Sequence, residues 1–147
     1  MAIILNFNPI VFFGRKKEMP ATVEGRWILT DYKWVHTDRV RSFTDGGYLS
    51  FSSSDSEYYL HFSKGYQCYL NAPVSAVFMD SPKQGGKYSV NVHKNEIIIK
   101  VDKQTVKFSL LCLTNDTMQL YWTDGGKNFT IEEFFIFTRD KSPSVEY

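Results

Sequence analysis

The sequence predicts an all-β protein, an up-and-down antiparallel β-barrel of about eight to ten strands. Segments of strand character are separated by turn signals about every 8 to 12 residues, and no segment has a convincing helical pattern. Aromatic residues make up 16% of the 147-residue chain, which suits pleated strands around a large apolar interior. The first clear strand opens at Trp27 and the last closes at Arg139, so a closed sheet would let the arginine stack on the indole.

The predicted strands occupy one continuous region, and a β-sandwich is the alternative arrangement. A hairpin turn is expected at residues 44–47, because Asp45-Gly46-Gly47 supplies the positive φ that tight turns need. Before it, residues 36–38 are expected to turn and residues 39–43 to form a short extension. Residues 80–86 are expected to be a loop. The strands are expected at residues 24–35, 48–52, 57–62, 66–70, 74–79, 88–92, 96–101, 104–113, 117–122 and 129–138.

Composition and charge exclude several classes of function. The formal net charge is +1, which gives no electrostatic argument for a nucleic-acid or anionic membrane partner. The histidines are scattered and lack metal-ligand spacing on one element, so no metal site is predicted. No serine lies in a Gly-x-Ser-x-Gly turn, and the paired glycines do not open a helix that could bind a phosphate. The sequence therefore predicts a non-enzymatic protein with no cofactor.

The two cysteines, Cys68 and Cys112, each lie among residues of a predicted strand. Two cysteines are too few for a disulfide scaffold. Buried free thiols are the expected state, and a single disulfide is the alternative.

The N-terminal residues precede the predicted barrel as an apolar arm. Their basic cluster, Arg15-Lys16-Lys17, follows the apolar part, which is the reverse of a secretory signal, and the apolar run is too short to span a membrane. A cytoplasmic protein is therefore expected. The arm has three alternative roles: an extra strand or helix packed on the barrel, a docking segment for a membrane or partner, or a disordered extension. The predicted organisation is an arm and linker at residues 1–22, a barrel at residues 23–139 and a polar tail at residues 140–147.

The closing strand is apolar on both of its faces. Phe135 and Phe137 alternate with Phe134 and Ile136, so one pair faces the interior and the other faces outward. An uncovered outer pair would leave an apolar patch on the barrel surface. The sequence therefore predicts that the arm, through residues 7–13, packs on the barrel exterior or pairs in a dimer.

Glu133 is the charged residue of most interest for function, because strand alternation places it on the same inward face as Phe135 and Phe137. An inward carboxylate must be paired, hydrated in a cavity or neutralised. Three arrangements are open: a partner arginine or tyrosine in a filled core, a bulge that turns the side chain outward, or a polar anchor in a ligand cavity. The predicted ligand-binding residues are Glu133, Trp122, Phe108 and Tyr88.

Four tyrosines give the middle of the chain an aromatic-rich character. They are Tyr58, Tyr59, Tyr66 and Tyr69. Packing in the core and barrel wall is the default for such residues, and a recognition surface at the open mouth of the barrel is the alternative.

Several of these segments resemble lipocalins and the bacterial lipocalin-like domains, which have calycin-type barrels. Gly25-Arg26-Trp27 is similar to the Gly-x-Trp opening of that family. The later order is also similar, with strands at residues 88–90, 96–99 and 120–122 and a final strand that ends in arginine. The resemblance covers residues 23–139 and implies that Trp27 floors the barrel while Arg139 packs over it, with Gly25 as the third residue of this structural signature. The middle Thr-Asp-Tyr turn and the final helix of animal lipocalins have no recognisable counterpart.

Two functions from different classes remain open. The resemblance and the aromatic interior imply a non-enzymatic binding protein that holds a small hydrophobic ligand in its barrel. The cytoplasmic prediction, the apolar arm and the tyrosine-rich segment suggest instead a protein-interaction module with a filled barrel, such as an inhibitor or an immunity-type protein that neutralises a toxin. Both a monomer and a dimer are compatible with the sequence.

Overall fold

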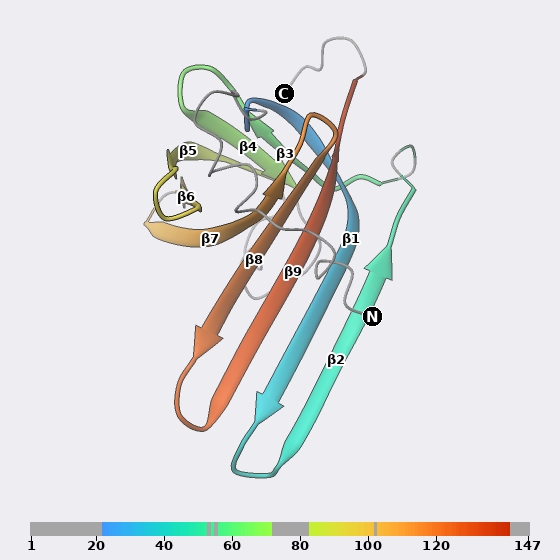
Figure 1. Ribbon diagram of the computed structural model, residues 1–147, viewed down its shortest axis with the longest axis vertical. Coiled ribbons are helices and arrows are strands. Elements are labelled where there is room, and N and C mark those ends of the chain that lie inside the picture. Colours follow the sequence, from blue (N-terminus) through green and yellow to red (C-terminus); the bar gives the residue numbers. More distant parts are fainter. Residues whose placement is uncertain (1–21, 53, 55, 72–82, 102, 142–147) are drawn as a thin grey trace.

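The computed structural model describes residues 22–52, 54, 56–71, 83–101 and 103–141. Every helix or strand assigned in these residues is a β-strand, which confirms the all-β prediction (Figure 1). Buried and exposed side chains alternate along several of them, as a strand with one face on a core requires. The strands are β1 (Gly25–Asp38), β2 (Phe43–Ser50), β3 (Tyr59–Phe62), β4 (Gln67–Asn71), β5 (Lys83–Asn91), β6 (Glu96–Val101), β7 (Gln104–Leu113), β8 (Thr117–Gly125) and β9 (Phe129–Arg139).

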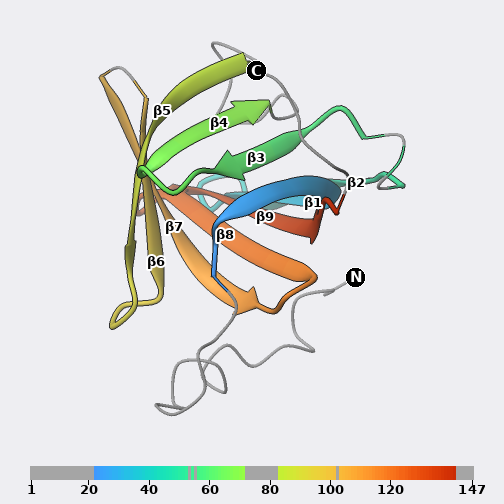
Figure 2. The same ribbon diagram turned by 90° about the horizontal axis from the view of Figure 1, so that it is seen from above.

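β1 closes the sheet into a barrel because it pairs with both β3 and β9. The start of β1 pairs with β3, and the stretch from Trp27 to Asp38 pairs with β9. From β3 to β9, each strand pairs antiparallel with the next. β1 and β3–β9 therefore form a closed eight-stranded barrel, seen as a ring in Figure 2. The predicted up-and-down barrel is confirmed, and the β-sandwich alternative is wrong.

Parts of three barrel strands, β1, β8 and β9, continue beyond the barrel and form a sheet with β2 at its edge. Residues 31–38 of β1 pair with β2 on one side and with β9 on the other, and β9 pairs in turn with β8. In Figure 1 these strands run together to the lower end of the molecule, away from β3–β7. We call this region the extended sheet: residues 31–38 of β1, 121–125 of β8, 129–134 of β9 and all of β2.

The turn between β1 and β2 lies at residues 39–42, so the hairpin turn predicted at residues 44–47 is wrong. Asp38 Oδ1 accepts hydrogen bonds from the backbone N–H groups of Val40 and Arg41 at 3.0 and 3.1 Å. An aspartate carboxylate that accepts hydrogen bonds from the N–H groups of residues shortly after it in the sequence stabilises a turn without any glycine. The predicted first strand therefore continues through residues expected to turn.

Gly47 and Gly86, which suggested a turn and a loop, lie in strands instead. At both positions a neighbouring group occupies the place where a Cβ atom would be. Gly47 is opposite Trp34, and a Cβ on this glycine would lie 2.7 Å from Trp34 Cε2. The tryptophan ring thus covers the glycine, a recognised cross-strand arrangement. The loop predicted at residues 80–86 is shortened in the same way, because β5 begins at Lys83 and a Cβ on Gly86 would strike a backbone carbonyl of β6.

The two ends of the barrel sheet meet at Trp27 and Arg139, which confirms their predicted contact. Trp27 is fully buried, and the Arg139 guanidinium carbon lies 4.1 Å from the centroid of its ring. Gly25 has a φ of 121°, and a Cβ there would lie 2.5 Å from Arg139 Nη1. Glycine at this position lets the arginine cross the start of β1.

Arg139 also binds three backbone carbonyls at this end of the barrel. Its Nη1 and Nη2 donate to the carbonyl oxygens of Glu24 and Thr22 at 2.6 and 2.9 Å. Its Nε donates to the carbonyl oxygen of Asn115 at 2.6 Å. The guanidinium therefore ties the segment before β1 to the β7–β8 turn, and we call this the closed end of the barrel.

Side chains fill the barrel between the closed end and the start of the extended sheet. Phe135 lies 5.2 Å from Tyr32 and 5.8 Å from Phe108, measured between ring centroids. These rings belong to one continuous buried cluster, the interior cluster. The largest fully buried side chains are Trp27, Phe62, Phe108, Phe135, Leu29, Leu60, Leu70, Ile97, Ile99, Leu110, Met118 and Leu120.

Both cysteines are free and buried, so the expected state is confirmed and the disulfide alternative is wrong. Cys68 belongs to the interior cluster, whereas Cys112 lies outside it, beside a bulge in β7. Burial raises the pKa of each thiol to about 11. Both thiols therefore stay protonated near neutral pH.

The stability of the protein is expected to fall between pH 9 and pH 11. A thiol in the unfolded chain loses its proton near pH 9, whereas the buried thiols keep theirs up to about pH 11. The stabilisation is therefore complete below pH 9 and is lost as the pH rises, by about 1.4 kcal/mol per pH unit for each thiol. Urea unfolding across this window checks the expectation: Cys112→Ala should show a shallower decline than the unchanged chain, and parallel declines would contradict it.

Some predictions concern residues that the structure does not describe. Residues 1–21, 72–82 and 142–147 lie outside the described residues, so the expectations for the N-terminal arm, for a strand at residues 74–79 and for most of the polar tail stay predictions. None of the described residues forms a helix that could span a lipid bilayer.

Candidate ligand-binding site

Two tryptophans flank a glutamate where the barrel wall passes into the extended sheet. Trp34 of β1 pairs with Glu133 of β9, and Glu133 pairs with Trp122 of β8. Residues paired across antiparallel strands lie on the same face of the sheet. Because Glu133 is buried and both tryptophans pack against the interior cluster, that face is the inward one. We call these three side chains the tryptophan row.

Tyr32, one step closer to the closed end, holds Glu133 through a hydrogen bond. The Tyr32 hydroxyl donates to Glu133 Oε2, and only 3% and 1% of the two residues is exposed. Burial and this hydrogen bond raise the pKa of Tyr32 far above its usual range, so the hydroxyl stays a neutral donor. Among the arrangements expected for Glu133, the structure has the tyrosine partner, and the outward-turning bulge is wrong. A role as ligand anchor stays a prediction.

Four aromatic side chains pack against the interior cluster but keep part of their surface open. Two of them are Trp34 and Trp122 of the tryptophan row. The others, Phe51 and Tyr58, lie between β2 and β3, with ring centroids 5.3 Å apart in an edge-to-face arrangement. The tryptophan row therefore adds accessible aromatic surface directly beside a buried hydrogen-bonded pair, a combination typical of ligand sites.

The inward face continues past the tryptophan row into the extended sheet. His36 of β1 pairs with Ile131 of β9, and its ring meets that of Phe129 edge to face at 4.4 Å. The His36 Nε2 atom is buried and has no hydrogen-bond partner within the described part of the chain. Phe129 is 40% exposed. The face thus offers one more aromatic surface and one polar atom next to the row.

The structure brings three of the four predicted ligand-binding residues into one region. Glu133 and Trp122 are direct neighbours in the tryptophan row. Phe108 contacts Phe135, which follows Glu133 on the same face of β9. Phe108 is fully buried, so it lies beneath the row and does not line its open surface.

Tyr88 does not lie with the other three. Its hydroxyl donates to the backbone oxygen of Ser63 at 2.9 Å, and its ring centroid lies 4.6 Å from that of Phe62. Phe62 pairs with Gly25, so this region borders the closed end. The inward direction of Tyr88 follows from alternation, but its position along the barrel axis depends on the stagger of the strands.

The four tyrosines considered as an interface occupy different surroundings. Tyr58 packs against the interior cluster, and the ring of Tyr59 lies 4.4 Å from the Arg26 guanidinium carbon. Tyr66 and Tyr69 are 67% and 37% exposed. The four side chains therefore do not share one face of the barrel.

Sequence reasoning missed Tyr32 and Trp34 because of an irregularity in β1. Trp27 and Leu29 face inward, and strict alternation from them would turn Tyr32 and Trp34 outward. The register shifts between Leu29 and Asp31, which returns the following even-numbered residues to the inward face. The sequence did contain one signal for these residues: Tyr32 and Trp34 are aromatic and two positions apart, so they share one face of their strand.

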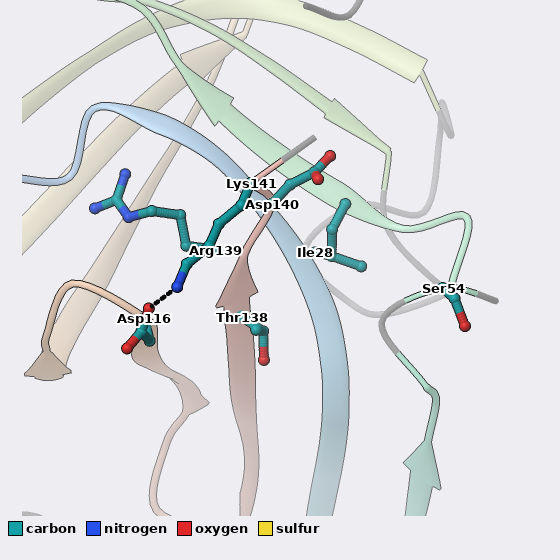
Figure 3. A pocket seen from close by; sticks show the side chains of 7 residues that line it. All are labelled: Ile28, Ser54, Asp116, Thr138, Arg139, Asp140 and Lys141. Atoms are coloured by element: carbon teal, nitrogen blue, oxygen red, sulfur yellow. Dashed lines mark ion pairs between the residues drawn. The ribbon is translucent and has the colours of Figure 1, made fainter. Parts of the chain in front are cut away.

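A hollow of about 500 Å³ lies at the surface of the closed end (Figure 3). Its charged groups pair with near neighbours: Lys141 Nζ lies 2.8 Å from Asp116 Oδ1, and Asp140 Oδ2 lies 3.4 Å from Arg26 Nε. The hydrogen bond from Lys141 lowers the pKa of the Asp116 carboxyl. These pairings make it a weaker candidate site than the tryptophan row. It is lined by Ile28, Ser54, Asp116, Thr138, Arg139, Asp140 and Lys141.

Metal ligation has no candidate cluster in the part of the chain that the structure describes. No group of three or more His, Cys, Asp or Glu side chains there is arranged to hold an ion. The site is therefore built from aromatic rings and one hydrogen-bonded pair.

Comparison with known proteins gives a likeness in fold. No family model matches the sequence, and no curated protein matches it significantly. Among solved structures, the chain is similar to apocrustacyanin C1, with a TM-score of 0.50 and 13% sequence identity over 91% of this chain and 69% of that chain. Crustacyanin is a lipocalin, so the likeness shows a lipocalin-like fold.

Proposed function

We propose that the protein is a non-enzymatic binding protein that holds a small, predominantly apolar ligand against the tryptophan row. The observation that carries this proposal is the row itself, in which Trp34, Glu133 and Trp122 lie side by side on the inward face. The lipocalin-like fold is consistent with a binding role, although fold alone does not assign one.

The chemistry of the row suits an apolar ligand with at least one polar group. Two indoles offer large apolar faces and N–H donors, while the buried Tyr32–Glu133 pair supplies oriented polar atoms next to them. Filled packing around Phe135 and Phe108 occupies the barrel toward the closed end. The proposed position of the ligand is therefore over the tryptophan row, at the end of the barrel away from the closed end, and not deep in the barrel.

The described side chains favour binding over catalysis. The pKa of Tyr32 lies far above its usual range, and burial raises that of both thiols to about 11. None of these groups is poised to exchange a proton or act as a nucleophile near neutral pH. Two free buried thiols also agree with a reducing compartment, so a cytoplasmic location is part of the proposal.

Trp122→Ala is expected to weaken the binding of an apolar ligand by at least about tenfold, because it removes half of the aromatic surface of the row. The measurement is a fluorescence titration with the apolar probe N-phenyl-1-naphthylamine, together with mass spectrometry of an organic extract of the natively purified protein. Tyr69→Ala is the matched control, since Tyr69 is an exposed aromatic outside the row. Equal affinities of Trp122→Ala and the unchanged chain would refute the proposal.

A protein-interaction role is the second candidate, and the edge of the extended sheet favours it. Phe43, Tyr48 and Leu49 of β2 are 53%, 43% and 45% exposed. Within the described residues β2 pairs only with β1, so its other edge is open to strand addition by a protein partner or a second copy. Co-purification of a stoichiometric protein that Leu49→Lys releases, without a bound small molecule, would favour this function.

A further inference from the structure

A buried patch lies on the outer side of the barrel wall. Cys112, Gln119 and Ile136 pair in series across β7, β8 and β9, so their side chains share one face. Their strand neighbours Met118 and Leu120 belong to the interior cluster, whereas these three do not. They therefore face outward, yet their exposed fractions are only 0%, 0% and 8%. We call these three side chains the outer patch.

No described strand lies over the outer patch. All nine strands belong to one sheet, and each pairs edge to edge with its neighbours in the barrel wall or the extended sheet. Figures 1 and 2 show no second layer of strands outside β7–β9. The strands of the sheet therefore do not cover the patch, and its cover comes from another part of the chain.

Gln119 indicates what kind of group covers the patch. Its side chain is fully buried, and neither its amide nitrogen nor its amide oxygen has a hydrogen-bond partner among the described residues. A buried amide without hydrogen bonds is costly, and such groups in native proteins are nearly always paired. A side-chain amide offers one acceptor and donors, which match the C=O and N–H groups of a passing backbone.

We propose that the N-terminal segment, residues 1–14, docks on the outer patch, with its apolar side chains over Ile136 and Cys112 and its backbone hydrogen-bonded to Gln119. The segment carries many large apolar side chains. They are Ile3, Ile4, Leu5, Phe7, Ile10, Val11, Phe12 and Phe13. Their composition matches a face that is apolar apart from one amide.

The position of Thr22, the first described residue, supports the N-terminal segment as the group that covers the outer patch. The carbonyl of Thr22 is bound by Arg139 Nη2, and Arg139 Nε binds Asn115 in the β7–β8 turn. Cys112 and Gln119 lie just before and just after that turn. An extended chain covers roughly 3.3 Å per residue, so the segment before Thr22 is long enough to reach the whole patch. The residues after Lys141 leave the same end but are fewer and mostly polar.

Cys112 is a natural reporter for this docking, with Cys68 as an internal reference. Both thiols are unreactive while buried, because burial raises their pKa to about 11. Uncovering the outer patch should free Cys112 alone, because Cys68 lies inside the barrel. Labelling with N-ethylmaleimide followed by peptide mass spectrometry reads both residues in the same molecule.

Deletion of residues 1–14 is expected to speed the labelling of Cys112 by at least about tenfold while Cys68 stays protected. Deletion of residues 142–147 is the matched control and should change neither rate. The proposal is overturned if Cys112 stays protected in the first variant, or if removal of the C-terminal residues exposes it. Exposure of Cys112 by dilution of the full chain would assign the cover to a second copy and would also overturn it.

A second variant keeps the test decisive if the shortened chain does not fold, which labelling of Cys68 would reveal. Phe12→Ser with Phe13→Ser in the full-length chain weakens the proposed docking without removing backbone. It should speed Cys112 labelling, whereas Arg15→Ser with Lys16→Ser, a pair outside the docked residues, should not. Equal labelling of Cys112 in these two variants contradicts the proposal.

Discussion

Arg139→Ala is expected to lower the free energy of unfolding by about 2–4 kcal/mol, because it removes charge-assisted hydrogen bonds and a cation–π contact together. The guanidinium binds the carbonyls of Thr22, Glu24 and Asn115 and lies 4.1 Å from the ring centroid of Trp27. None of these carbonyl contacts is local in sequence, so alanine releases both the segment before β1 and the β7–β8 turn. Urea unfolding at neutral pH measures the loss.

Arg139→Lys is the matched variant for this expectation. Lysine keeps the positive charge but cannot direct three N–H groups toward separate carbonyls as the planar guanidinium does. We expect it to recover part of the loss and to fall between alanine and the unchanged chain. If lysine restores full stability, charge alone closes this end of the barrel; if alanine is as stable as arginine, the closed end does not depend on this residue.

The sequence predicted those parts of the fold that depend on local pattern. The alternation is regular in β6 and in β7 as far as Leu110, and the short polar connection between the two strands leaves little choice of pairing. The contact of Trp27 with Arg139 was also predictable, because a closed barrel brings its first and last strands together. In each case residues close in sequence, or the closure of the sheet, determine the structure.

The extended sheet was not predictable because tertiary packing overrides its local signals. Asp45-Gly46-Gly47 has the composition of a turn, yet Gly47 lies in β2 under the indole of Trp34. The actual turn at residues 39–42 contains no glycine and depends on the Asp38 carboxylate. A sequence window contains the glycines but does not contain the ring that occupies their space.

Only part of the candidate site was predictable, because one of its two hydrogen-bonded residues follows from local pattern and the other depends on tertiary pairing. Alternation alone placed Glu133 inward, and the structure confirms its burial. Its partner Tyr32 is 101 positions away in the sequence, on a strand whose register shifts after Leu29. Neither the pairing of β1 with β9 nor the shift can be read from local pattern. The charged residue was therefore predictable, and its hydrogen-bond partner was not.

Tyr32→Phe is expected to lower the free energy of unfolding by about 2–4 kcal/mol, because it removes a hydrogen bond from a carboxylate that is almost fully buried. Phenylalanine keeps the ring that packs 5.2 Å from Phe135, so the apolar contact is preserved. The loss therefore reports on the polar pair and not on a cavity.

Combining Tyr32→Phe with Glu133→Leu tests whether the two residues act as one unit. Each single change leaves a buried polar group with a lost partner, whereas the double change removes both groups at once. The double variant should therefore lose less stability than the sum of the two single losses, by at least about 1 kcal/mol. Urea unfolding of all four proteins gives this difference. If the two single losses in the free energy of unfolding simply add, the hydrogen bond does not couple Tyr32 to Glu133. Glu133 would then be the only polar group of this pair that contributes to the proposed binding site.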